Sequence, residues 1–118
     1  MYLIATRSFP PEVGGMQSLM WGLAKEMSKN FMIKVFADYQ ENHKEFDKEV
    51  NFSIERVGGI KFLRKIRKAQ LINEFLKENK VQGIIADHWK SLELIKTKKN
   101  KYCLIHGKEI NHPKGSFQ

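Results

Sequence analysis

Four short runs of apolar residues recur along the chain and predict buried β-strands. They cover residues 2–5, 32–37, 83–87 and 102–105. Their apolar residues are continuous and do not alternate with polar ones, which is typical of a strand buried on both faces. Residues 52–57 instead alternate apolar and polar side chains, and this pattern predicts a half-exposed strand at an edge of a sheet.

Two longer segments place apolar residues every three or four positions, which is the pattern of an amphipathic helix. The first predicted helix covers residues 15–29, with an apolar stripe of Met16, Met20, Leu23 and Met27. The second covers residues 60–79, with Phe62, Ile66, Ala69, Ile72 and Leu76. A short helix is expected at 91–95, with Ser91 as its cap. Residues 39–50 and 96–101 have no apolar stripe and are predicted to be surface loops.

Apolar strands that alternate with amphipathic helices predict an α/β fold. We expect a single Rossmann-like domain over residues 1–118, with a parallel sheet covered by helices on both faces. In such sheets ligands bind outside the carboxyl ends of the strands. Chemically distinctive residues follow each predicted buried strand, and we expect them at this one edge: Gly14, Gly15, Asp38, Asp87, His88, His106 and Gly107.

The loop at residues 6–18 is the most distinctive of these strand ends. Pro10 and Pro11 prevent a continuous helix or a central strand. Gly14 and Gly15 let the backbone approach a ligand closely, and they precede a helix whose free N–H groups favour anions such as phosphate. The loop has neither the spacing of a dinucleotide fingerprint nor that of a P-loop. A simple turn rich in glycine and proline remains an alternative.

The composition indicates an anionic partner. The formal net charge is +8 and the isoelectric point is about 9.6, which suits anionic lipid, phosphorylated small molecules or nucleic acid. We expect no nucleic-acid partner, because no motif of that kind is recognised. The single cysteine excludes an internal disulfide and favours an intracellular location. The four histidines lack metal-ligand spacing, so no metal is expected.

The helix predicted at residues 60–79 carries many of these positive charges. Lys61, Arg64, Arg67 and Lys68 lie away from its apolar stripe, with Lys65 near the boundary. Arg64, Lys68, Leu71 and Phe75 fall on one line of the helix, so the basic face runs into apolar residues. Basic side chains beside exposed apolar groups suit a helix that lies on anionic lipid. A solvated charged face beside a wide core stripe is the alternative.

Three segments together resemble the acceptor-side domain of family 4 glycosyltransferases, which are retaining enzymes of the GT-B fold. Residues 7–17 read RSFPPEVGGMQ and resemble the opening of these enzymes. Residues 87–92 (DHWKSL) and 105–110 (IHGKEI) are similar to two later landmarks. The likeness covers nearly the whole chain, and it implies a hexosyltransferase that uses a nucleotide sugar and no other cofactor.

The resemblance also implies roles for individual residues. Gly14 and Gly15 would present N–H groups to the donor diphosphate, and Gln17 would help to hold the acceptor. His106 would lie beside the transferring sugar as the catalytic residue, and Asp87 would line the acceptor pocket. The basic helix, with Arg64 and Lys68, resembles the part that contacts the acceptor and docks on the membrane in members that glycosylate lipids.

The chain departs from the family because the donor-binding C-terminal domain, with its E-x-x-x-x-x-x-x-E motif, is absent. We therefore expect a piece of a longer enzyme, or a half completed by a partner, that is inactive alone. Its expected partners are a nucleotide-sugar donor, a glycan or lipid acceptor and the missing domain. The expected location is the cytoplasm, at the anionic inner membrane surface. The alternative function is a non-catalytic basic module that binds membrane or protein.

Overall fold

A computed structural model describes residues 1–104, which form an α/β fold around a five-stranded, all-parallel sheet. The strand order is β3-β2-β1-β4-β5, which is the Rossmann-like arrangement. The predicted fold class is therefore confirmed. The strands are β1 (Tyr2–Ala5), β2 (Ile33–Asp38), β3 (Ser53–Val57), β4 (Gly83–Ala86) and β5 (Asn100–Cys103). The predicted catalytic His106 and the neighbouring Gly107 lie outside the described residues.

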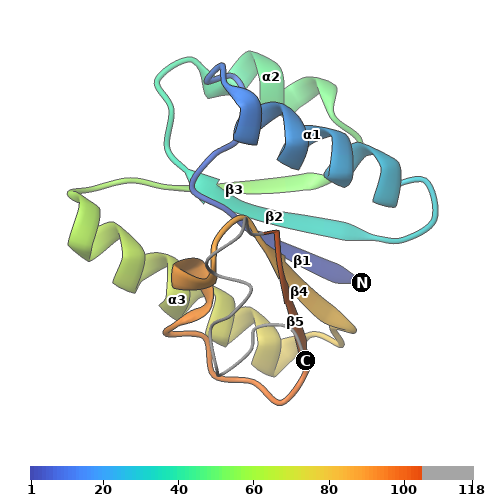
Figure 1. Cartoon of the computed structure of the whole chain (residues 1–118), viewed down its shortest axis with the longest axis vertical. Helices are drawn as coiled ribbons and strands as arrows, with labels where there is room; N and C mark the ends of the chain where they lie inside the picture. Colours follow the sequence, from blue (N-terminus) through green and yellow to red (C-terminus); the bar gives the residue numbers. More distant parts are fainter. Residues whose placement is uncertain (105–118) are drawn as a thin grey trace.

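Helices cover both faces of the sheet, as the alternation of elements predicts. Figure 1 shows α1 (Gly15–Met27) and α2 (His43–Glu49) on one face and α3 (Lys61–Glu78) on the other, with the short 3₁₀ helix η1 (Trp89–Leu92) beside α3. None of the helices within residues 1–104 combines the length and the apolar character that crossing a membrane requires.

The continuous apolar runs are explained by the two cores that the sheet separates. Successive side chains of a strand point to opposite faces. Leu3 of β1 accordingly packs with Ile72 of α3, whereas its neighbour Ile4 packs with Met20 of α1. Strand β3 lies at the edge of the sheet, and its half-exposed pattern confirms the prediction for residues 52–57.

The loop after β1 is anchored by an aromatic side chain. Phe9 is fully buried and makes edge-to-face contacts with Trp21 of α1 and Phe46 of α2, with ring centroids 6.4 and 6.1 Å apart. Its ring also meets Phe52, which precedes β3. Such pairs add stability beyond their buried area. The loop is therefore part of the core, and Phe9 fixes where it leaves the sheet.

Four sequence predictions were wrong in detail. The strand predicted at 102–105 as buried on both faces is β5, which covers Asn100–Cys103 at an edge of the sheet and leaves Tyr102 42% exposed. The predicted loop at 39–50 contains α2. Phe46 is the one apolar residue of this helix, and a single apolar residue gives no periodic pattern. Residues 96–101 are not entirely a loop, because β5 begins at Asn100. The helix expected at 91–95 is a 3₁₀ turn that begins earlier, and His88 rather than Ser91 caps it by accepting a hydrogen bond from the Lys90 N–H.

The predicted apolar stripe of α3 is confirmed for Ala69, Ile72 and Leu76, which pack in the core, but two residues of the helix lie on other faces than predicted. Phe62, assigned to the apolar stripe, is 69% exposed, whereas Lys68, assigned to the basic face, is only 6% exposed. The side chains that face the sheet include Lys68, Ala69 and Ile72, with Leu71 and Phe75 packed beside them. The line from Arg64 to Phe75 therefore faces the sheet and does not face solvent.

Candidate functional site

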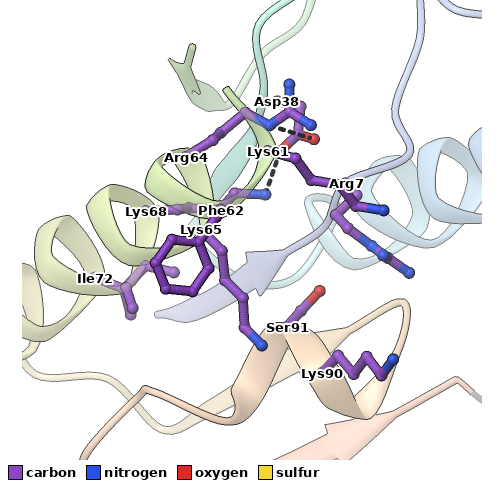
Figure 2. Close-up of a pocket in the computed structure, with 11 residues that line it drawn as sticks. Arg7, Asp38, Lys61, Phe62, Arg64, Lys65, Lys68, Ile72, Lys90 and Ser91 are labelled. Carbon is purple, nitrogen blue, oxygen red and sulfur yellow. Dashed lines mark hydrogen bonds and ion pairs between the residues drawn. The ribbon is translucent and has the colours of Figure 1, made fainter. Parts of the chain in front are cut away.

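A cavity of about 330 Å³ lies where the carboxyl ends of β1, β2 and β4 meet the first half of α3. Its wall includes Arg7 after β1, Asp38 at the end of β2, and Lys90 and Ser91 in η1 (Figure 2). The strand order reverses between β1 and β4, and this reversal is where ligands bind in open α/β sheets. The cavity therefore occupies the position that the fold favours for a ligand.

Basic side chains dominate the wall of this cavity. Its lining contains one carboxylate, that of Asp38, and six cations from three separate parts of the chain: Arg7, Lys61, Arg64, Lys65, Lys68 and Lys90. Phe62, Ala69 and Ile72 supply an apolar section of the wall. The cavity can therefore receive a ligand that has an anionic part and an apolar part.

Asp38 and Lys68 form a buried ion pair at the base of the cavity. The Lys68 ammonium donates to Asp38 Oδ1 and to the Thr6 carbonyl, the latter at 2.9 Å. Arg64 Nε lies 3.2 Å from the other oxygen, Asp38 Oδ2. The pair thus ties α3 to the ends of β1 and β2, and both carboxylate oxygens of Asp38 have cationic partners.

The burial of Lys68 lowers its pKa from the usual 10.5, because desolvation disfavours the ammonium form. The charge of Asp38 and its hydrogen bond oppose this decrease, as does the charge of Asp87, while Arg64 adds to it. Lys68 therefore acts as a fixed structural partner of Asp38, and the free positive charge of the cavity comes from other residues.

Three cations of the wall are not paired with a carboxylate of the described residues. Arg7, Lys61 and Lys90 are exposed, and none of them forms an ion pair with any residue in 1–104. Lys65 differs, because its ammonium is paired with Glu93. The positive charge available to a ligand therefore comes mainly from Arg7, Lys61 and Lys90.

Asp87 holds two segments of the wall in place but is not itself part of the lining. Its carboxylate is almost fully buried and accepts hydrogen bonds from the Arg7 backbone N–H at 3.0 Å and the Ser91 hydroxyl at 2.9 Å. It therefore connects the loop after β1 to η1. Asp87 thus fixes the Arg7 backbone relative to Ser91, and its predicted role in the acceptor pocket stays a prediction.

The glycine pair lies at the same edge of the sheet but at the start of α1, on the opposite face from the cavity. Gly14 precedes the helix, and a Cβ atom there would lie 2.2 Å from Gln17 Oε1. A Cβ at Gly15 would meet nothing within 4 Å. The first turn of α1 has no acidic residue and no side-chain cap, so its N–H groups remain suited to an anion.

The side chain of Gln17 folds back over this loop. Its Nε2 donates to Glu12 Oε1 at 2.9 Å, and Gln40 Nε2 donates to the same oxygen at 3.3 Å. These contacts connect the loops that follow β1 and β2. Of the predicted site residues, Arg64 and Lys68 thus meet in the cavity, whereas Gly14, Gly15 and Gln17 form a separate group.

The sequence reasoning missed Arg7, Lys90 and Ser91 as lining residues. Arg7 lies two positions after β1, so the rule that ligands bind at strand ends was a sufficient signal for it. The sequence indicated Lys90 and Ser91 less clearly, because they lie in the short helix η1 and not directly at a strand end. No group of metal-ligating side chains occurs in the part of the chain that the structure describes.

Comparison with models of known protein families gives no match, and comparison with curated protein sequences gives none either.

Proposed function

We propose that the chain is the acceptor-side domain of a retaining, family 4-like glycosyltransferase, which transfers a sugar from a nucleotide sugar to a lipid-linked or other glycan acceptor. One observation carries this proposal. The N-terminus of α1, at Gly14 and Gly15, and the basic cavity lie at the same carboxyl edge of a Rossmann-like sheet, on opposite faces. Two anion-compatible sites at one edge of the sheet suit a reaction in which a sugar leaves a donor diphosphate and is transferred to a second substrate.

In this proposal the first turn of α1 stabilises the leaving diphosphate. Glycosyl transfer develops negative charge on the leaving group, and oriented N–H groups stabilise that charge without reorganisation. Gly15 leaves open space where a side chain would otherwise stand. His106 is assigned by resemblance to the position beside the sugar, where an imidazole suits hydrogen bonding or proton relay. The remaining donor contacts belong to a second domain or a partner.

A Gly15→Ala variant tests the donor site. Alanine favours the helix and meets no atom within 4 Å, so the fold is expected to stay intact while the methyl group obstructs the diphosphate. Titration with UDP- and GDP-sugars, followed by amide NMR, should perturb residues 14–17 in the wild type. We expect the variant to bind at least about five-fold more weakly, which is the effect of roughly 1 kcal/mol.

Gly22→Ala is the matched control, because Gly22 lies in the same helix and a Cβ there also meets nothing within 4 Å. This control should bind the nucleotide sugar as the wild type does. Equal affinity in all three proteins, or no perturbation at residues 14–17, would contradict the proposed donor site.

Exposed apolar residues at the start of α3 favour a second candidate, a non-catalytic module that docks on anionic membrane. Ile60, Phe62 and Leu63 are exposed beside Lys61 and Arg67, and such a surface suits an anionic interface. Phe62→Ser with Leu63→Ser should then reduce sedimentation with vesicles, whereas Met32→Ser, at an exposed residue before β2, should not. A module of this kind would bind vesicles without any perturbation of residues 14–17 by nucleotide sugars.

A further inference from the structure

We infer that the cavity between η1 and α3 binds a phosphate monoester or diphosphate group. The identification of this group as part of the acceptor rests on the proposed function, but the binding site itself does not. This site is separate from the glycine-opened end of α1, which lies on the other face of the sheet (Figure 1).

The argument starts from the charge that remains after internal pairing. Asp38 is the one carboxylate of the wall, and both of its oxygens are already engaged by Lys68 and Arg64. The cations of Arg7, Lys61 and Lys90 then have no counter-ion within residues 1–104. Converging uncompensated cations raise the local concentration of an anion, and a multiply charged group gains most from them.

The backbone segments that carry these cations are held at defined places. The Arg7 backbone N–H donates to the Asp87 carboxylate, which also accepts a hydrogen bond from the Ser91 hydroxyl, so the backbone that carries Arg7 is tied to η1. Lys61 is the first residue of α3, whose position is set by the buried pair of Lys68 and Asp38. Figure 2 shows the basic side chains around one space, from the loop after β1, from α3 and from η1.

The apolar section of the wall indicates what is attached to the phosphate. Ala69 and Ile72 are buried in the α3-side core, and Phe62 stands largely exposed among the lining residues. A ligand with a phosphate group and an adjoining apolar part would contact both kinds of surface. A free sugar without a phosphate would leave the cations unmatched.

The test compares two triple variants with the same loss of charge. The cavity variant combines Arg7→Gln, Lys61→Gln and Lys90→Gln. The control variant combines Lys44→Gln, Lys48→Gln and Lys80→Gln, which are exposed residues away from the cavity. Pyrophosphate is titrated into the 118-residue chain at about 0.15 M salt, where distant charges are screened, and binding is followed by calorimetry and amide NMR. We expect perturbations at Arg7, Lys61 and Ser91 in the wild type.

The cavity variant should bind pyrophosphate at least about ten-fold more weakly than the wild type, while the control changes by less than about two-fold, as expected for distant, screened charges. Equal losses in the two variants would overturn the inference, because net charge would then explain the binding. Binding without perturbation of the cavity residues, or no binding at all, would overturn it as well.

A second arm distinguishes a free phosphate from a lipid headgroup. Phosphatidylcholine vesicles that contain phosphatidic acid are compared with vesicles that contain phosphatidylglycerol at equal surface charge. A preference for the monoester headgroup that the cavity variant loses would assign the phosphate to a lipid. Pyrophosphate binding without this preference would assign it to a soluble ligand. Vesicle binding that the cavity variant retains, without pyrophosphate binding, would overturn the cavity site.

The two proposals can fail separately. If Gly15→Ala leaves nucleotide-sugar binding unchanged while the cavity variant loses pyrophosphate, the donor assignment fails and the phosphate site stands. If Gly15→Ala weakens nucleotide-sugar binding and the cavity variant behaves like its control, the phosphate site fails and the donor site stands.

Discussion

Lys68 joins three elements through one ammonium group. It donates to Asp38 at the end of β2 and to the Thr6 carbonyl that follows β1, and it is carried by α3. A buried charge of this kind is costly unless it is paired, and removing one partner of a buried pair is more destabilising than replacing both. The site depends on this pair, because it fixes α3 against the strand ends.

We expect Lys68→Met to lower the free energy of unfolding by about 3 kcal/mol, because Asp38 keeps its burial and loses one of its cations. Urea unfolding followed by circular dichroism measures this. Lys29→Met is the matched control, since the 3.0 Å pair of Lys29 with Glu26 is exposed to solvent. Such pairs contribute little, and the control should change stability by less than about 1 kcal/mol.

The pH dependence of the same comparison has a defined sign. Burial lowers the pKa of Lys68 in the folded chain below 10.5. Between that lowered pKa and 10.5 the unfolded chain binds more protons at this residue, so the wild type should gain stability relative to Lys68→Met as the pH rises. A difference that stays constant or decreases toward alkaline pH would contradict this assignment.

The sequence indicated the line of Arg64, Lys68, Leu71 and Phe75 on α3 but not the direction in which it points. Periodicity places residues on a face, whereas the choice of the buried face depends on the partner across it. Here the partner is Asp38, which compensates a lysine that would otherwise face water. The position of Asp38 at a strand end was predicted, but its pairing with a residue thirty positions away was not.

Helix α2 shows what a short element requires when it lacks an apolar stripe. It is held by Phe46 in the aromatic cluster and by an ion pair with β3. In that pair the Arg56 side chain is 4% exposed, and its Nη2 lies 2.7 Å from Asp47 Oδ1. Arg56 also donates to the Pro10 carbonyl at 2.6 Å, so the same guanidinium connects α2 to the loop at residues 6–18.

We expect Asp47→Ala to lower stability by about 2–3 kcal/mol, because it leaves a buried guanidinium without its carboxylate. Hydrogen exchange should accelerate first in α2 and in the loop around Pro10. Glu45→Ala, at an exposed position of the same helix, should have little effect. Equal effects of the two substitutions would show that α2 does not depend on Arg56.

The existence of α2 could be predicted only weakly. Asn42 and Glu45 have the spacing of a helix start, but the Asn42 side chain makes no capping hydrogen bond. The helix is seven residues long, which is too short to be stable without tertiary contacts. Its contacts with Phe9 and Arg56 come from distant parts of the sequence, and local patterns do not reveal them.

At the scale of the whole molecule, alternation of strands and helices was sufficient to predict a parallel sheet and the edge where polar residues gather. The order of the strands was not predictable from the pattern, although it decides which loops adjoin. Because β1 and β4 are neighbours, Arg7 meets the segment that contains Lys90 and Ser91. The cavity is a product of this adjacency, and no single stretch of sequence contains it.

We expect the 118-residue chain by itself to transfer no sugar, because the resemblance assigns most donor contacts to a second domain. Release of nucleoside diphosphate from a panel of nucleotide sugars, with and without lipid and glycan acceptors, measures this. Transfer by the purified chain that Gly15→Ala abolishes would contradict the expectation and would show that one domain is sufficient.

The pairing of Asp38 with Lys68 has a consequence for how this sequence can diverge. A neutral residue at position 68 leaves buried Asp38 with Arg64 as its remaining partner, and a neutral residue at position 38 leaves the buried Lys68 ammonium without a carboxylate. Either single replacement should therefore be destabilising. Related chains should either retain both residues or exchange both for apolar ones. Where both are exchanged, the internal neutralisation of the phosphate-facing wall disappears, and those chains should differ in the ligand that they accept.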